Sequence, residues 1–293
     1  MSEVEINPDS PEYLSWMKIA GYGNYKKMRL SRERSGKFQA IFKRGHSACF
    51  KEDIEAKEKD ALAIFFGRDI EVPVCPLSEK DLKKWLNLGF EPHFLPKMQF
   101  SPERNFPGWH ERPQAIFYEK IQQGKISKTA INLCGRWILI DNRPKPRKKV
   151  PWITCSNIIS RGAEIFSFKP QNYFKRWAKQ QYKDDFLLPV LERYGWKSRY
   201  ACSIEDIERI KPEIAQNFGL KKEQIRLPYF VEYNFLSNLF YPEWRETDTW
   251  EWLEDKFGQD CHLCSGANSC SIIGWDPVSF WSTILGFRLV VVL

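Results

Sequence analysis

The stretch that decides the fold is Thr249-Trp-Glu-Trp-Leu-Glu-Asp255, near the carboxyl end of the chain. Its two tryptophans alternate with polar residues, so both indoles can enter one core face of a β-strand. The composition changes directly after it: Glu254 is the last glutamate and Lys256 the last lysine, although these two types make up about a sixth of the chain. A solvated surface normally carries Lys and Glu. The 37 residues that follow are therefore either buried, or their composition has a cause other than exposure to solvent.

The whole chain has the size and composition of a folded protein, with 293 residues, 15% aromatic residues and 12 tryptophans. That length suits one large domain, or a main domain with a smaller one, and the aromatic content excludes disorder. No apolar segment follows Met1, and no window approaches the 18 apolar residues of a membrane span. We therefore expect a cytoplasmic protein as synthesised, with association at a virus or cell surface by another route left open.

Hydrophobic periodicity and capping signals predict a mainly helical first part and a mixture afterwards. Expected helices cover 51–66, 78–88, 116–123, 171–194 and 203–217, and expected strands cover 136–141 and 289–293. Five prolines between residues 91 and 113 exclude a long helix or a central strand there, and few helix signals follow residue 225. The predicted class is α+β, with a mainly helical portion over 1–130 and a second domain over 131–293.

Three short segments in the last 70 or so residues carry a family resemblance. They are Arg226-Leu-Pro228 with Val231-Glu-Tyr233, then Trp250-Glu-Trp252, then Leu285-Gly-Phe-Arg288. In this order they resemble the formylglycine-generating enzyme superfamily, which shows R-L-P-x-x-x-E-W/Y, then W-E-W, then G-F-R. The resemblance implies a C-type-lectin-like fold for the C-terminal domain.

Glu232 and Arg288 are charged residues inside otherwise apolar motifs. We expect partly buried ion pairs or hydrogen bonds to the backbone at these positions, because a fold short of regular structure needs such contacts to hold its loops. Ordinary exposed charges are the alternative.

Enzymes of this superfamily oxidise a substrate cysteine with copper held by two thiolates, and soft thiolates suit that metal. Here Cys264 and Cys270 are separated by five residues where the family has four, and no arginine lies between Arg245 and Arg288, where the family has an Arg-rich stretch. Cys261-His-Leu-Cys264 has a zinc-like spacing, but no second pair follows it. We expect unpaired thiols, no catalytic residues, no metal and no cofactor. A copper-dependent oxidase stays as the first alternative function.

Within this superfamily, the chain most resembles the variable proteins of diversity-generating retroelements. Adenine mutagenesis there turns AAC and AAT codons into any codon ending in a pyrimidine, and such codons cannot encode Lys, Glu, Gln, Met or Trp. Residues 260–288 contain none of the first four, and the cysteines at 261, 264 and 270 become ordinary outcomes of random codons. Burial as core strands is the alternative, and it fits 285–293 better than the Gly-, Asp- and Ser-rich stretch 260–284. Leu263 to Gly274 also resembles the Gly-Gly pattern of that branch, with Ala267 and Ile273 standing where the pattern has glycine.

The resemblance implies a non-catalytic protein whose rigid scaffold displays a variable segment, about 260–284, to an unidentified protein or cell-surface ligand. The candidate ligand-binding residues are Asp260, Cys261, His262, Cys264, Ala267, Ser269, Cys270, Ser271, Ile272, Asp276, Ser279, Phe280, Ser282, Thr283 and Ile284. The candidate scaffold residues are Arg226, Leu227, Pro228, Glu232, Trp250, Glu251, Trp252, Trp275, Trp281, Gly286, Phe287 and Arg288.

The net charge is +8, and the densest basic cluster is Arg143-Pro-Lys-Pro-Arg-Lys-Lys149. A nucleic-acid patch is one interpretation and gives the second alternative function. We favour a solvated, proline-stiffened loop between two strands, because no interleaved aromatic residues or zinc ligands accompany the cluster. Nucleic acid is therefore not expected as a partner.

Overall fold

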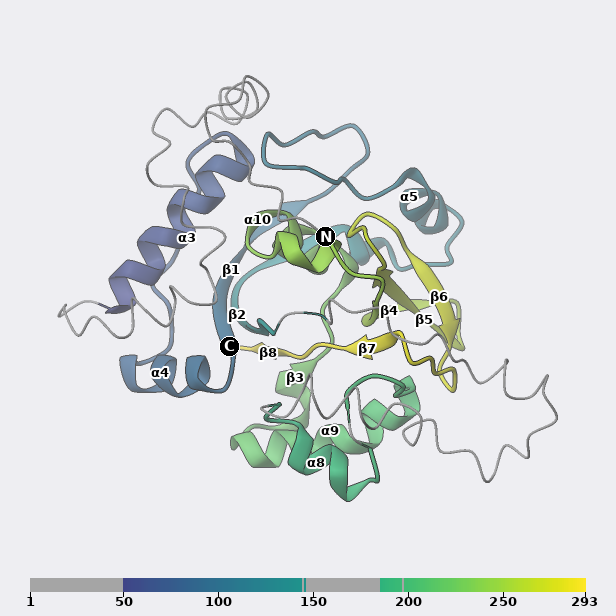
Figure 1. Ribbon diagram of the computed structural model, residues 1–293. Helices are drawn as coiled ribbons and strands as arrows, with labels where there is room; N and C mark the ends of the chain where they lie inside the picture. The colour runs from purple at the N-terminus through teal and green to yellow at the C-terminus, as the bar shows by residue number, and fades with distance from the viewer. Residues whose placement is uncertain (1–49, 144, 146–184, 197) are drawn as a thin grey trace, which may run out of the picture. The chain divides into compact units, whose positions relative to one another are not determined.

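The computed structural model describes residues 50–143, 145, 185–196 and 198–293. These residues form six α-helices and two four-stranded sheets (Figure 1), which confirms the predicted α+β class. The α-helices are α3 (Phe50–Phe66), α4 (Glu79–Asn87), α5 (Ala115–Gln122), α8 (Leu188–Arg193), α9 (Ile204–Phe218) and α10 (Phe230–Leu239), and the short 3-10 helices are η2 (Lys128–Ile131), η3 (Lys222–Gln224) and η4 (Pro242–Arg245). The strands are β1 (Phe90–Gln99), β2 (Asn132–Asp141), β3 (Ile225–Arg226), β4 (Trp250–Phe257), β5 (Cys261–Gly266), β6 (Gly274–Pro277), β7 (Leu285–Phe287) and β8 (Val290–Val292).

The described residues divide into two compact units, the first with 50–74 and 105–109 and the second with 75–104 and the rest of the chain from 110. In the first unit the ring of Phe65, at the end of α3, lies 5.9 Å from that of Phe106 and 6.0 Å from that of Trp109. The expected boundary near residue 130 falls inside the second unit, because β1 pairs with β2 across it.

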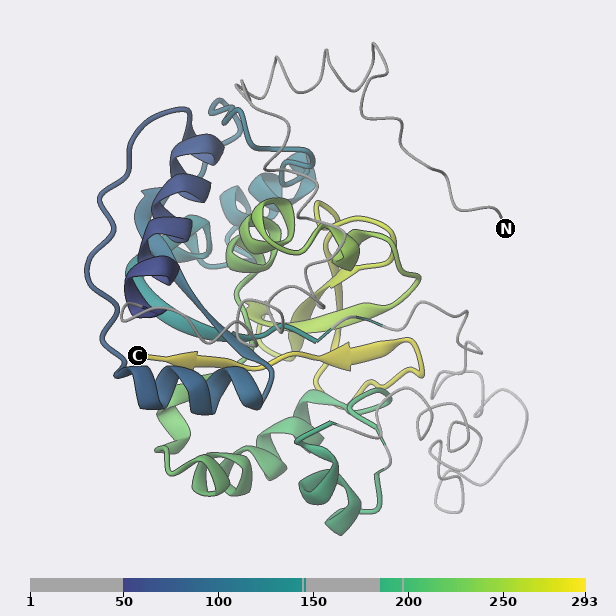
Figure 2. The same cartoon turned by 60° about the vertical axis from the view of Figure 1, so that its left-hand side comes forward.

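Both sheets belong to the second unit. One has the order β1-β2-β8-β3 with antiparallel neighbours, and the other has the order β6-β5-β4-β7, in which β7 runs parallel to β4. Strands β7 and β8 follow each other at the carboxyl end of the chain (Figure 2), so these last residues join the two sheets.

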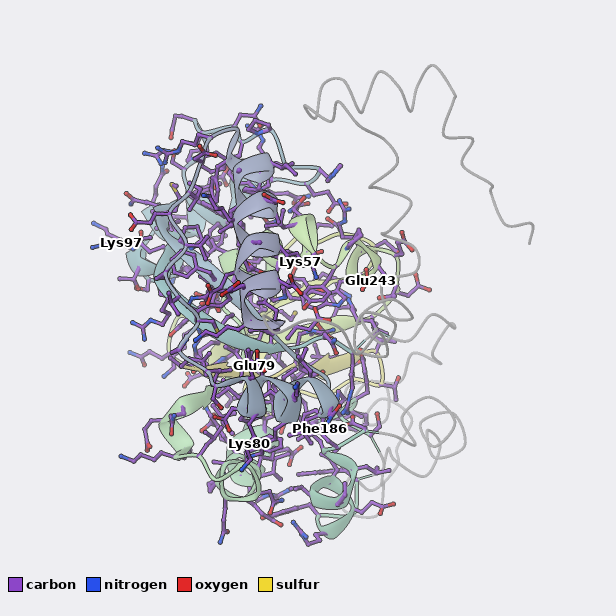
Figure 3. All side chains as sticks on the ribbon, turned by 90° about the vertical axis from the view of Figure 1, so that its left-hand side faces the viewer. Lys57, Glu79, Lys80, Lys97, Phe186 and Glu243 are labelled. Atoms are coloured by element: carbon purple, nitrogen blue, oxygen red, sulfur yellow. The ribbon has the colours of Figure 1, made fainter. Side chains whose placement is uncertain are left out.

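The sequence signals for helix ends are confirmed where the structure describes them. The Ser78 hydroxyl accepts a hydrogen bond from the Asp81 amide at 3.1 Å at the start of α4, and Ser203 and Asp206 form a reciprocal capping box on α9. Helix α4 is amphipathic as expected: Leu82 and Trp85 are buried, while Glu79 and Lys80 are exposed on its first turn (Figure 3). Of the helix expected over 171–194, the part before residue 185 lies outside the described residues.

Strand β1 crosses the proline-rich segment in which we expected no central strand, and it is an edge strand of its sheet. The Asn142 amide donates to the Gly89 carbonyl at 2.9 Å, so by alternation Pro92 directs its nitrogen away from β2. The register passes from Leu95–Arg136 to Lys97–Cys134 and skips Pro96. Both prolines thus avoid positions where the ladder needs an N–H donor.

Helix α10 was not expected, because few helix signals follow residue 225. Nine of its ten residues are buried, so its sequence lacks the polar face that marks an amphipathic helix. The Tyr229 amide donates to the Glu232 carboxylate at 3.0 Å, which caps the first turn. The helix therefore forms inside the core, where periodicity gives no signal.

The two tryptophans of the Trp250-Glu-Trp252 motif enter the core as predicted. Trp252 is fully buried and its indole N–H donates to the Cys202 carbonyl at 2.9 Å, while Trp250 is half-buried against the same cluster. Leu285 and Phe287 of β7 belong to that cluster too. Among the described residues, no helix combines the length and the apolar character needed to cross a bilayer.

Candidate functional site

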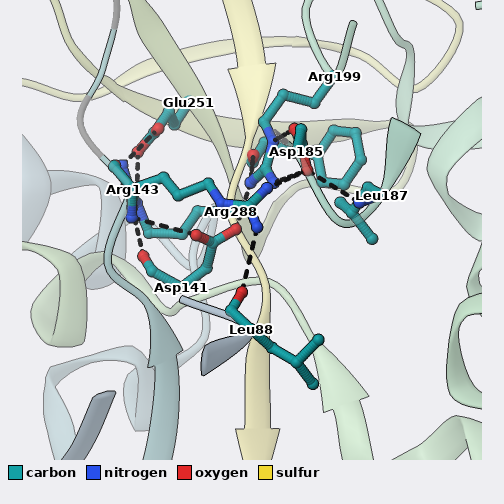
Figure 4. A network of polar contacts seen from close by, with 9 residues as sticks. Leu88, Asp141, Arg143, Asp185, Leu187, Arg199, Glu251 and Arg288 are labelled. Carbon is teal, nitrogen blue, oxygen red and sulfur yellow. Dashed lines mark hydrogen bonds and ion pairs between the residues drawn. The ribbon is translucent and has the colours of Figure 1, made fainter. Parts of the chain in front are cut away.

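The junction between the two sheets is held by Arg288, which lies between β7 and β8 (Figure 4). Its guanidinium pairs with the Glu251 carboxylate of β4 at 2.9 and 3.1 Å, and it also donates to the carbonyls of Asp141 and Arg143. Burial lowers the pKa of Arg288, but Glu251 and Asp141 outweigh it and raise the pKa above its ordinary value. The expected buried ion pair is confirmed, and it fastens β4 to the end of β2.

A second buried ionic cluster adjoins the first (Figure 4). Arg199 pairs with Asp141 and, at 2.8 Å, with Asp185, and Asp185 also pairs with Arg143. Burial raises the pKa of Asp185, but Arg199 and Arg143 together hold it below its ordinary value. These charges tie the segment before α8 to the two sheets.

Arg226 and Glu232 form a further, partly buried pair, with two hydrogen bonds of 2.6 and 2.7 Å. Next to them the Leu227 amide donates to the Glu254 carboxylate at 3.0 Å, and the Pro228 carbonyl accepts from the Glu254 amide at 3.0 Å. The Arg-Leu-Pro segment is thus pinned to β4, which confirms the expected contacts of Glu232.

The remaining scaffold candidates divide into core and surface. Phe287 is fully buried, and Gly286 leaves no room for a side chain because a Cβ there would lie 2.8 Å from the ring of Tyr200. Trp281 is half-buried, whereas Trp275 is 39% exposed. The Trp275 indole lies on the surface of β6, so its assignment to the scaffold stays a prediction.

The described part of the basic cluster 143–149 turns inward. Arg143 donates to the Leu88 carbonyl at 3.1 Å, and the buried Lys145 ammonium donates to the carbonyls of Thr249 and Trp244, the latter at 3.3 Å. Burial lowers the pKa of Lys145 to about 8. Arg143 and Lys145 are therefore part of neither a solvated loop nor a nucleic-acid patch. Residues 144 and 146–149 lie outside the described residues.

The candidate variable segment is built on the β5–β6 hairpin. Cys261, His262, Leu263 and Cys264 face Pro277, Asp276, Trp275 and Gly274 in turn. Cross-strand partners share a face, so His262, Cys264 and Asp276 lie on one face of the hairpin, while Cys261 and Trp275 lie on the other.

The turn of this hairpin, residues 267–273, is tied to the protein by its own polar groups. The Glu111 carboxylate accepts from the Ser269 hydroxyl at 2.7 Å and from the Cys270 amide at 2.9 Å. The Asn234 amide group donates to the Cys270 carbonyl at 3.0 Å, and the Asn238 amide group donates to the Glu111 carbonyl at 3.0 Å. The turn is therefore held in place, and few of its polar groups are left to bind a ligand.

Five candidate ligand-binding residues are buried, and their assignment is corrected. They are Cys264, Cys270, Ser271, Ser282 and Thr283. Their small side chains fit inside the packed turn and the approach to β7, so the absence of Lys and Glu there reflects burial.

The opposite end of the hairpin, residues 260–262 and 275–280, is open, and we call it the open end. Six candidates are exposed or half-exposed here: Asp260, Cys261, His262, Asp276, Ser279 and Phe280. Ala267, Ser269, Ile272 and Ile284 are half-exposed elsewhere. The structure thus places six of the fifteen candidates at one end of the hairpin, with His262 and Asp276 on one face and Cys261 on the other, where the exposed indole of Trp275 also lies.

The thiols do not form the arrangement that copper or zinc needs. Cys264 lies 3.9 Å from an oxygen of Asp276, whereas Cys270 lies 3.6 Å from the side-chain nitrogen of Asn234. Burial raises the pKa of both thiols, that of Cys270 to about 12, which disfavours the thiolate form that binds metal. Cys261 and Cys264 point to opposite faces of β5, because a spacing of three reverses the side-chain direction in a strand. In the described part of the chain, no group of three His, Cys, Asp or Glu side chains has an arrangement that could hold a metal ion.

Sequence reasoning missed the residues that hold the turn, which are Glu111, Asn234 and Asn238. It also missed the burial of Lys145, which donates to the carbonyls of Trp244 and Thr249. A signal existed for the asparagines, which lie four apart inside an apolar run and so share one side of a helix. Glu111 lies more than 150 positions before its partners in the turn, and no local pattern links them.

Comparison with known proteins gives no match: no protein-family model, no curated protein and no solved structure matches this chain.

Proposed function

We propose that this chain is a non-catalytic ligand-binding protein of the retroelement-diversified kind, with a C-type-lectin-like C-terminal domain. Its ligand contacts lie at the open end of the β5–β6 hairpin. The observation that carries the proposal is the division of the segment: the open end is exposed, while the turn and the strands behind it are fixed by buried contacts. Substitutions at the open end would therefore alter binding while leaving the fold intact.

The two ionic fasteners support this reading. Arg288 with Glu251 fastens β4, the strand beside the hairpin, and Arg226 with Glu232 fixes the Arg-Leu-Pro segment that is pinned to β4. A bidentate ion pair holds the two segments that it joins in one geometry. A binding face whose side chains vary needs such a fixed backbone.

The test is genomic. DNA near the gene is expected to hold a near-copy of the part that encodes about 257–288, differing mainly at adenines, beside a gene for a reverse transcriptase. The differences should fall at the codons of open-end residues such as Asp260, His262 and Ser279, and spare those of Trp275 and Trp281. A single-copy segment without such a neighbour would contradict the proposal.

The copper-dependent oxidase gains no support from the two separated, protonated thiols. Equilibrium dialysis with Cu(I) separates the two functions: tight uptake that Cys264→Ser and Cys270→Ser both abolish would favour the oxidase.

A further inference from the structure

The open end carries an aromatic and cationic group that the binding proposal does not use. The rings of Phe257 and Trp275 stack in parallel, 4.3 Å apart at 9°, and the Lys120 ammonium of α5 lies over the Trp275 ring, 5.8 Å from its centroid. Trp275 is 39% exposed, and Phe257 and Lys120 are half-exposed. We call these three residues the platform.

The platform offers a partner the edge of the indole. Phe257 covers one face of the ring, and Lys120 lies over the ring as well, so little free face is left for a stacked nucleobase. The edge of an aromatic ring is positive, the indole N–H is a donor only, and the Lys120 ammonium is a cation. All three groups favour an oxygen acceptor with negative charge.

On this face of the strands the residues beside the platform are uncharged, and a further lysine lies nearby. Cross-strand pairing places Cys261, Leu263 and Pro277 on this face of the strands beside Trp275, and none of them is acidic. Lys125 is exposed next to Gly258, whose amide donates to the Lys125 carbonyl at 2.8 Å. The carboxylate Asp276 points to the other face of the hairpin, opposite His262.

The open edge of β6 lacks one backbone donor. The Val278 amide donates to the Asp260 carbonyl at 3.0 Å, so Trp275 and Pro277 direct their backbone away from β5, towards the open edge of β6. Pro277 has no N–H to offer there, which blocks the addition of a further strand.

We propose that the platform binds an acidic peptide segment of a protein partner, with a carboxylate received by Lys120 and the edge of Trp275, and an apolar side chain resting against Phe257. This inference rests on the proposed binding function and names the chemistry of its ligand.

The experiment measures fluorescence anisotropy of a labelled random copolymer of Glu and Tyr with the full chain, at low ionic strength. Trp275→Ala and Lys120→Glu are each expected to weaken binding at least fivefold. Two matched controls are expected to change it less than twofold: Tyr194→Ala removes an exposed ring stacked on Trp196 and capped by Arg209, and Lys97→Ala removes an exposed cation that projects from β1 (Figure 3).

The inference is overturned if the native chain does not bind the copolymer, or if the platform variants weaken binding no more than the controls. If Trp275→Ala does not fold, Lys120→Glu alone is compared with the controls. A copolymer of Lys and Tyr should not bind, and equal binding of both copolymers would indicate aromatic adhesion, which also contradicts the inference. The genomic test is independent of this one. If a near-copy of the gene segment is found but the copolymer does not bind, the acidic ligand is contradicted and the proposed function is not.

Discussion

At the scale of single residues, the turn of the hairpin holds a backbone conformation that its sequence disfavours. Ala267 has a φ of 53°, in the left-handed region that glycine adopts freely, and it stands where the resembled pattern has glycine. Ala267→Gly is expected to raise the free energy of unfolding by about 0.5–1 kcal/mol. Urea denaturation measures the change. The same substitution at Ala130, buried in η2, is expected to destabilise, and a similar loss at Ala267 would contradict the strain.

A second prediction at this scale concerns Asp255, which is buried and whose carboxylate accepts from the Phe230 amide at 2.6 Å. Burial raises its pKa to about 7, and nearby Glu232 adds to the rise. Because the folded pKa lies above the unfolded one, its contribution to stability is complete below about pH 4 and is lost as the pH rises through about 7. Asp255→Asn should remove on the order of 3 kcal/mol of this pH dependence.

The check for Asp255 is the unfolding free energy of native chain and variant, compared between pH 4 and 8. The difference between them should shift in favour of the variant as the pH rises. A constant difference would mean that the carboxylate is ionised throughout.

At the scale of elements, the Arg288–Glu251 pair fastens β4 to the end of β2, because Arg288 also donates to the carbonyls of Asp141 and Arg143. Removing one partner of a buried pair leaves an uncompensated charge, so Arg288→Met is expected to cost about 3–5 kcal/mol. Arg209→Met is the matched control: it breaks an exposed pair with Asp206 at 2.9 Å and should cost about 0–1 kcal/mol. Thermal unfolding of both variants checks the contrast, and equal losses would refute a special role for the junction.

Elements with a local signal were predictable from the sequence, and the others were not. The Ser78 and Ser203 caps and the strand after Arg136 rest on short-range patterns, and the structure has them at those places. Helix α10 was missed because a helix that is buried on every side has no apolar periodicity. Strand β1 was missed because a strand can contain Pro92 only where the proline nitrogen points away from the neighbouring strand, and the sequence does not show this direction. The candidate surface was half predictable: its loop composition indicated exposure, but which residues turn inward depends on Glu111, Asn234 and Asn238, which are distant in sequence.

At the scale of the whole second unit, the structure is a fixed frame with one open hairpin end. We expect the side chains of that end to tolerate change and those behind it to be fixed. The frame consists of the buried ionic pairs, the Trp252 core and the clamped turn. Binding specificity could then change without loss of the fold.

The most direct test compares two codon libraries, each with every codon ending in a pyrimidine. One randomises Asp260, His262, Asp276 and Ser279 at the open end, and the other randomises the buried Cys264, Cys270, Ser282 and Thr283. Displayed variants are scored by resistance to protease. Most open-end variants should stay within about 0.5 kcal/mol of the native chain, whereas most buried variants should lose about 1–3 kcal/mol. Equal losses in the two libraries would contradict the account.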